Sequence, residues 1–347
     1  MSSDVKIESS LSTVLPKMNA SDSIIDALGL ILNGNSVVDF IRLHFNNDSE
    51  IDNFLKLNNF VLTEARAYKR IYHIYNDAIN YLSSLEIDIP QEFKELSDIR
   101  ELFRYASYIK GSKTLSKISC SILKVMHVLH HVESRELMYR SSISIEDLFS
   151  ACEAKVSKAI SELNRSGISI YHYSTCRENI FDRITKLIAR KEIIAAQMFE
   201  KASFNIITEK KEDVLFVLRY LITNVFPFNY VVPGYSSSNY IDLVNILKSS
   251  DEYTKKIDRY QFTKESSNIN SFADRVYMKV DIPLDINSLG IKIDEETAEN
   301  LGFTIFSLTE FTITDVESHR KTEQSYINQQ NQRLLLKREA IARITKE

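Results

Sequence analysis

Through the first half of the chain, apolar residues recur every three or four positions, which is the spacing of an amphipathic α-helix. Small polar residues that can cap a helix N-terminus precede two of these segments, at Ser21 and Ser144. The pattern predicts a helix from Ser21 and longer helices over residues 64–85, 90–109, 114–139 and 144–165. The first half is therefore expected to be mainly helical.

Beyond residue 167, apolar and polar residues alternate, as they do in half-buried β-strands. Between two of these alternating segments, an acidic cluster from Glu209 followed by an apolar repeat predicts a helix. Residues 203–232 are therefore expected to form a strand–helix–strand unit, and a long helix is expected from Ser318. The predicted strands cover residues 168–173, 203–208, 226–232, 275–284 and 302–314.

Together these elements predict an α+β fold, with a mainly helical N-terminal half and a C-terminal half that contains a small mixed β-sheet of about four or five strands covered by helices. We divide the chain into a flexible leader, a helical region, an α+β region and a C-terminal helix. No linker rich in Pro, Gly or Ser separates the halves, so the boundaries rest on the change of pattern alone. The leader covers residues 1–19, the helical region 20–166, the α+β region 167–317 and the C-terminal helix 318–347.

The composition of the 347 residues narrows the functional classes. The apolar runs are shorter than the ~20 residues that span a bilayer, and residues 1–10 lack a basic-then-apolar signal pattern, so we expect a cytoplasmic protein without a membrane partner. The three cysteines are widely spaced, which argues against a disulfide framework and a zinc site. None of the seven glycines forms a dinucleotide-binding or P-loop motif, and no segment shows a specific nucleic-acid signal.

Three histidines on the predicted helix 114–139 are candidates for metal binding. His127 is three residues from His130 and four from His131, so each pair shares a helix face. A zinc-protease helix would have Glu directly after the first histidine, but Val128 stands there. We therefore favour the interpretation that these histidines are packed or hydrogen-bonded at a helix interface.

The last predicted strand contains one carboxylate in an otherwise apolar run. Alternation places Phe311 and Ile313 on one face of this strand, and Phe306, Leu308 and Glu310 on the other. A carboxylate at this position needs a partner or a function if it is buried. Glu310 is therefore a candidate site residue.

At these positions the chain resembles (p)ppGpp synthetases of the RelA/SpoT type, which have a nucleotidyltransferase fold. The likeness lies in a helix that ends in Glu200, a strand that starts near Phe204, the Glu212-Asp213 start of the next helix, and the late TEFTI strand. The chain also resembles an uncharacterised family of bacterial proteins of about this length, mostly proteobacterial. That second likeness covers roughly residues 115–340 and is most specific in 184–208 and 224–234.

The resemblance implies a site for a purine nucleotide and Mg²⁺. In the synthetases, two carboxylates hold Mg²⁺ against a nucleoside triphosphate, and the matching residues here are Glu200 and Glu310, which would be both metal ligands and catalytic residues. Basic side chains would bind phosphate oxygens, and a tyrosine would stack on the base. The matching nucleotide-binding residues are Lys186, Arg190, Lys191 and Tyr240.

The chain departs from the synthetase pattern at several of these positions. Asn205 stands where an arginine would neutralise phosphate, and Thr312 replaces the glutamine that follows the late glutamate. Ser203 replaces a further basic residue of the bacterial family. Glu200 stands in place of an aspartate, and the extra methylene moves the carboxylate by about 1.5 Å, enough to disturb a catalytic metal site.

Three hypotheses follow. The chain is a nucleotidyltransferase-like domain, which could be a Mg²⁺-dependent nucleotide pyrophosphokinase, or it is a degenerate relative that keeps the sheet but binds a nucleotide or a protein without turnover. Alternatively, it is a catalytically inactive helical interaction or regulatory protein whose sheet organises the core. The first hypothesis predicts that Glu200 and Glu310 lie within a few Å of each other, and the last predicts that Glu310 faces solvent or pairs with a local Lys or Arg. The sequence does not determine an oligomeric state.

Overall fold

The structure is a computed structural model, and it describes residues 21–33, 43–107, 109–177, 180–189, 202–232, 237–238, 241 and 275–345. The predicted leader and the predicted nucleotide-binding residue Tyr240 lie outside these residues. In the described part, α-helices precede a five-stranded sheet, so the chain has the α+β fold that the sequence predicts.

The helical half follows the predicted pattern closely. Side chains of Asn47, Ser112 and Ser144 accept hydrogen bonds from backbone N–H groups in the first turns of α4, α7 and α8, which fixes where these helices begin. The helices of this half are α3 (Asp22–Asn33), α4 (Asp48–Leu57), α5 (Ala65–Ser84), α6 (Arg100–Ala106), α7 (Lys113–Arg140) and α8 (Ile145–Arg165).

The single helix predicted over residues 90–109 is wrong in part. The structure has a 3₁₀ turn, η1 (Gln91–Phe93), and then the short helix α6. Between them, the Asp98 carboxylate accepts a hydrogen bond from the backbone N–H of Arg100 at 3.0 Å. Such local side-chain bonds to the backbone favour a helix start over a helix interior, so a new helix begins here.

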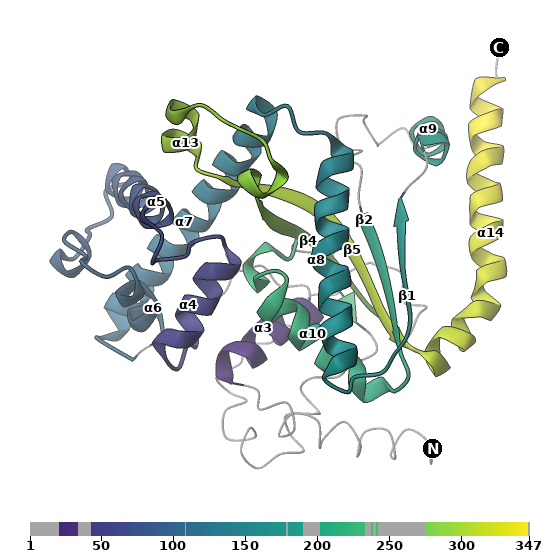
Figure 1. Ribbon diagram of the computed structural model, residues 1–347, viewed down its shortest axis with the longest axis horizontal. Helices are drawn as coiled ribbons and strands as arrows, with labels where there is room; N and C mark the ends of the chain where they lie inside the picture. The colour runs from purple at the N-terminus through teal and green to yellow at the C-terminus, as the bar shows by residue number, and fades with distance from the viewer. Residues whose placement is uncertain are drawn as a thin grey trace.

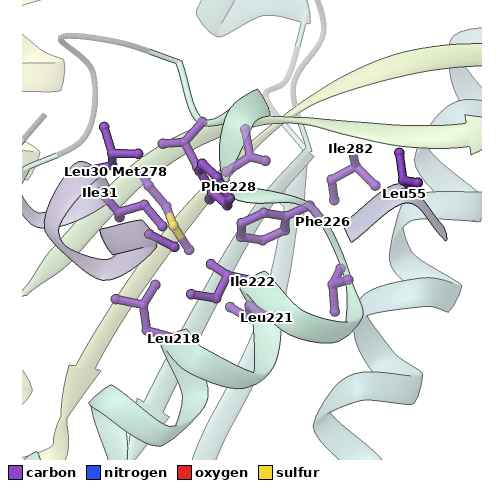
Figure 2. Close-up of a cluster of buried hydrophobic side chains, with 14 of the residues drawn as sticks. Leu30, Ile31, Leu55, Leu218, Leu221, Ile222, Phe226, Phe228, Met278 and Ile282 are labelled. Atoms are coloured by element: carbon purple, nitrogen blue, oxygen red, sulfur yellow. The ribbon is translucent and has the colours of Figure 1, made fainter. Parts of the chain in front are cut away.

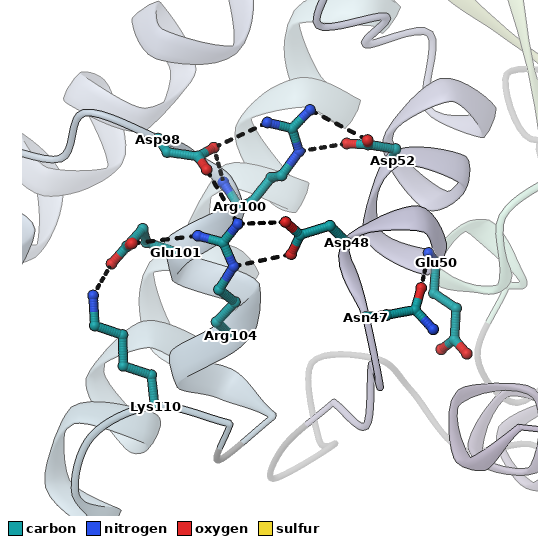
Figure 3. A network of polar contacts seen from close by, with 9 residues as sticks. All are labelled: Asn47, Asp48, Glu50, Asp52, Asp98, Arg100, Glu101, Arg104 and Lys110. Carbon is teal, nitrogen blue, oxygen red and sulfur yellow. Dashed lines mark hydrogen bonds and ion pairs between the residues drawn. The ribbon is translucent and has the colours of Figure 1, made fainter.

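Charged side chains join α4 to α6 (Figure 3). Arg104 donates to both carboxylate oxygens of Asp48, at 2.9 and 2.6 Å, and Arg100 does the same to Asp52, at 2.6 and 3.2 Å. An arginine that donates to both oxygens of a carboxylate sets the relative orientation of the two side chains and also pairs their charges. The two pairs set the position of α6 relative to α4.

The described strands form one mixed sheet in the order β1-β2-β5-β4-β3. Strand β2 runs parallel to β5, while β1 and β2, β4 and β5, and β3 and β4 are antiparallel pairs. The two strands at its centre, β2 and β5, are thus separated by about a hundred residues of chain. The strands are β1 (Ile170–Arg177), β2 (Ala202–Thr208), β3 (Ser237–Ser238), β4 (Val276–Asp285) and β5 (Thr304–Asp315).

The strand predicted over residues 226–232 is wrong, and so is the strand–helix–strand unit. A 3₁₀ turn, η3 (Phe228–Tyr230), follows Pro227. Among the described residues, this segment meets the sheet through a bridge between Val231 and Val280, with the Val232 N–H donating to the Lys279 carbonyl at 2.8 Å. Proline lacks an N–H group for a sheet ladder, and Phe226 packs beneath the sheet instead. β4, by contrast, continues through Pro283, which is tolerated because β3 pairs only with the first two residues of β4.

One face of the sheet carries the core. Phe204, Phe311 and Met278 share this face by register and are fully buried. Helices α8 and α10 (Lys211–Asn224) cover it (Figure 1), and Figure 2 shows Leu218 and Ile222 of α10 close to Phe226 and Met278. Burial of this apolar surface is the main term that favours the fold.

The C-terminal helix α14 (Val316–Ile344) continues directly from β5, close to the start predicted at Ser318. It packs against α9 (Ile180–Ala189), and Arg343 donates to the Ile188 carbonyl at 3.0 Å. The short elements η5 (Ile286–Leu289) and α13 (Glu295–Leu301) connect β4 to β5. In the described part of the chain, no helix combines the length and apolarity needed to cross a membrane.

Candidate ligand-binding face of the sheet

The sheet face opposite the core is polar around Glu310. Residues that pair across neighbouring strands point to the same face, and Ser203 and Lys279 both pair with Glu310, while Asn205 pairs with Thr312. All five side chains are half-buried. We call the surface that three strands build here the polar face, and it consists of Ser203, Asn205, Tyr277, Lys279, Glu310 and Thr312.

Glu310 and Lys279 form an ion pair at the middle of the polar face. Their Oε1 and Nζ atoms are 3.6 Å apart, and their side chains are 23% and 15% exposed. The strand alternation thus predicts the face of Glu310 correctly. Its partner is a lysine on the adjacent strand β4.

The structure describes two of the six residues that the resemblance implies. Lys186 lies on α9, which packs against α14, and Glu310 lies on β5. The predicted approach of Glu200 to Glu310 falls outside the described residues. So do the predicted roles of Arg190, Lys191 and Tyr240, and all of these stay predictions.

Beyond Lys279, the polar face reaches a buried acid and helix α7. Asp281 lies two residues from Lys279 on the same face of β4, and its Oδ2 atom is 3.6 Å from His131 Nε2. Burial raises the pKa of Asp281 to about 6, although the charge of Arg135 opposes this. Burial, with Arg135, lowers the pKa of His131. At pH 7 this pair is therefore a carboxylate beside a neutral imidazole.

The histidines of α7 are packed at an interface, as the favoured interpretation predicts. The ring of His131 stacks on Phe306 at 5.1 Å between centroids, and the Tyr230 hydroxyl is 2.5 Å from His130 Nδ1. Burial lowers the pKa of His127 to about 4 and that of His130 well below its usual value. These rings are thus neutral packing groups near pH 7.

The described residues do not fit a metal ion. None of them form a group of three or more His, Cys, Asp or Glu side chains that could hold one. Glu310 has the ammonium of Lys279 beside it, and this charge repels a divalent cation. We therefore derive no chemical step through Mg²⁺ from this face.

Lys279, Tyr277 and Asp281 were not among the candidates from sequence. The sequence did indicate that these three residues share one face of the predicted strand, because apolar and polar residues alternate over 275–284. What the sequence could not give was the neighbour of that strand. Only the pairing of β4 with β5 brings Lys279 to Glu310.

Comparison with known proteins gives a distant likeness. No family model and no curated protein matches the chain, so the resemblance to a bacterial family has no support from sequence. Among solved structures, the small alarmone synthetase 1 from Bacillus subtilis bound to its product pppGpp has 12% identity and a TM-score of 0.34, over 57% of this chain and 86% of that one. A second structure of that synthetase has 15% identity and a TM-score of 0.28, over 57% and 91%.

Proposed function

We propose that the chain is a nucleotide-binding protein whose polar face holds the phosphates of a purine nucleotide without metal-dependent turnover. The observation that carries the proposal is a half-buried lysine, Lys279, at the centre of a sheet face with hydroxyl and amide donors around it. The purine is the ligand class that the resemblance to RelA/SpoT-type synthetases implies.

The donors of the polar face match phosphate chemistry. Lys279 offers an ammonium, Ser203 and Thr312 offer hydroxyl protons, and Asn205 offers an amide N–H group. Phosphate oxygens accept bonds from all of these groups, and bonds between charged partners are the strongest. Tyr277, which pairs with Thr312, supplies an aromatic ring at the same face.

Glu310 acts in this proposal as the counter-ion of Lys279. A carboxylate beside the lysine compensates its charge while no ligand is bound, and a phosphate then competes with it. The transferase hypothesis gives Glu310 the opposite role, because there the carboxylate attracts Mg²⁺ and the nucleotide with it. The two hypotheses therefore predict opposite effects of removing its charge.

The test is a binding titration with GDP, GTP and ATP, in Mg²⁺ and in EDTA. We expect binding that does not need Mg²⁺, that weakens at least about tenfold in Lys279→Gln, and that stays equal or tightens in Glu310→Gln. Lys292→Gln removes an exposed lysine outside the polar face and serves as the matched control.

Two results would contradict the proposal in different ways. Binding that requires Mg²⁺ and is lost in Glu310→Gln would favour the nucleotidyltransferase hypothesis, with Glu200 and Glu310 as metal ligands, and would justify an assay of pyrophosphoryl transfer. No binding of any nucleotide would leave the helical interaction protein, in which the Lys279–Glu310 pair is only structural.

A further inference from the structure

A cleft of about 570 Å³ lies where α3, α4, the end of α10 and η3 meet. This volume is within the range of small-molecule sites, about 300–1,000 Å³. One side of α4 lines the cleft with residues three and four positions apart, which are neighbours on a helix surface. Apolar side chains form part of the wall, and hydroxyl and amide groups form much of the rest. The residues of that side of α4 are Glu50, Asn53, Phe54 and Leu57.

Glu50 is the one charged side chain among the described residues that line the cleft. The other acids of α4, Asp48 and Asp52, are paired with Arg104 and Arg100, and Figure 3 shows Glu50 apart from both pairs. Within the part of the chain that the structure describes, the half-buried carboxylate of Glu50 forms no ion pair. The cleft therefore has an uncompensated negative charge in its wall.

Neutral donors hold the Glu50 carboxylate in place. The Ser23 hydroxyl of α3 donates to Oε2 at 2.7 Å, and the backbone N–H of Asn46 donates to the same atom at 3.3 Å. Since this uses the only hydroxyl proton of Ser23, the Ser21 hydroxyl, 2.9 Å away, donates to Ser23. These bonds orient the carboxylate and leave its charge. The positive end of α4 amounts to only about half an elementary charge.

The other oxygen of Glu50 is open to a further donor. Oε1 accepts one long bond, from Asn46 Nδ2 at 3.4 Å, and a carboxylate oxygen can accept two. Asn46 is exposed and Glu50 is half-buried, so a solute can reach this carboxylate from the surface. A single carboxylate does not suit a divalent metal ion, which needs several oxygen ligands. An ammonium group needs only one such acceptor.

An aromatic cluster stands beside Glu50. Phe54, one turn along α4, also lines the cleft, and its ring centroid lies 5.4 Å from that of Phe45 and 5.3 Å from that of Phe228. Aromatic faces attract both apolar groups and ammonium groups. We propose that the cleft binds a small organic cation, a primary amine with an apolar body, whose ammonium pairs with Glu50 and whose body packs against Phe54. This site is independent of nucleotide binding at the polar face.

The probes are 2-phenylethylamine and 2-phenylethanol, which share one carbon skeleton. At pH 7 the amine is a cation, while the alcohol is neutral and can still donate one hydrogen bond. Binding to the full-length protein is measured by isothermal titration calorimetry. We expect saturable binding of one amine per chain, at least about tenfold tighter than that of the alcohol, because a hydrogen bond between charged partners is the stronger one.

Glu50→Gln removes the charge and keeps an oxygen that can accept the bond from Ser23. In this variant the amine should bind no more tightly than the alcohol does. Glu92→Gln makes the same substitution at an exposed acid outside the cleft and should bind the amine as wild type does. Both variants change the net charge equally, so a difference between them reports the site.

A second pair of variants tests the cleft itself and does not depend on the folding of Glu50→Gln. Ile24→Phe adds volume at a half-buried position of the wall and should abolish binding of both probes. Ile341→Phe makes the same substitution at an exposed residue of α14 and should leave binding unchanged. The inference would be overturned by the absence of saturable amine binding, by equal affinity for the two probes, or by wild-type amine affinity in Glu50→Gln or Ile24→Phe.

Discussion

At the scale of single residues, buried polar side chains hold separate elements of this protein together. Arg70 donates through Nη1 to the carbonyls of Glu299 and Asn300, at 3.2 and 2.8 Å, and through Nη2 to Glu133. Its side chain lies so close to Gly302 that a Cβ atom there would be 2.8 Å from Nε, and Gly302 has a φ of +77°. One arginine on α5 thus holds the end of α13 and an acid of α7.

Replacing Arg70 should be costly for this reason. Arg70→Leu leaves Glu133 half-buried without its partner and frees two carbonyls, and removal of one member of a buried ion pair costs about 3–5 kcal/mol. Arg66→Leu, one turn earlier on α5, removes a half-exposed arginine paired with Asp285 and should cost about 0–1 kcal/mol. Urea denaturation of both variants measures the difference. Equal losses would contradict the role given to Arg70.

The half-buried imidazole of His127 predicts a pH dependence of stability. Its folded pKa of about 4 lies below the usual 6.5, so between these values the unfolded chain binds more protons. Its contribution to stability is therefore complete above about pH 6.5 and is lost as the pH falls towards 4. The difference of about 2.5 pH units corresponds to about 3 kcal/mol as an upper bound.

The measurement compares the free energy of unfolding at pH 7 and at pH 5 in wild type and His127→Gln. We expect the variant to lose less stability on acidification than wild type does. His172→Gln replaces an exposed histidine of β1 and should leave the wild-type profile unchanged. If His127→Gln also follows the wild-type profile, the titration belongs to other groups whose folded pKa is lowered, such as His130 or His131.

At the element scale, hydrophobic periodicity was enough for the long helices and for β2 and β5. It failed at residues 226–232, where the apolar spacing of Phe226, Phe228 and Tyr230 imitates a strand. The structure buries all three side chains, Phe226 just before Pro227 and the other two from the 3₁₀ turn that follows it. A short apolar run that contains a proline does not by itself distinguish a β-strand from a 3₁₀ turn.

The burial of Phe226 can be tested by truncation. Its ring is fully buried and lies 5.4 Å from that of Phe311 between centroids. Phe226→Ala should destabilise the protein by about 3–5 kcal/mol, because it removes buried surface and leaves a cavity. Phe181→Ala, at a residue that is 71% exposed, should change stability by no more than about 0.5 kcal/mol. Thermal unfolding followed by circular dichroism compares the two.

At the scale of the whole molecule, the sequence predicted the fold class, but it did not predict which strands pair at the centre of the sheet. Local periodicity carries no information on which strands pair, and β2 and β5 are joined in parallel across about a hundred residues. The candidate site depends on this pairing. Glu310 was found from its strand, whereas Lys279 and Ser203 became its neighbours only through the order of the strands.

A ligand on the polar face would contact strands that are far apart in sequence, and it should therefore stabilise the whole fold. At a concentration of 100 times its dissociation constant, a ligand that binds only the folded state adds about 2.7 kcal/mol. We expect GDP or GTP to raise Tm in wild type and in Glu310→Gln but not in Lys279→Gln, each compared with the same variant without ligand. Because the contact is electrostatic and half-buried, the rise should shrink with added salt. An equal rise in Lys279→Gln would place the nucleotide away from the polar face.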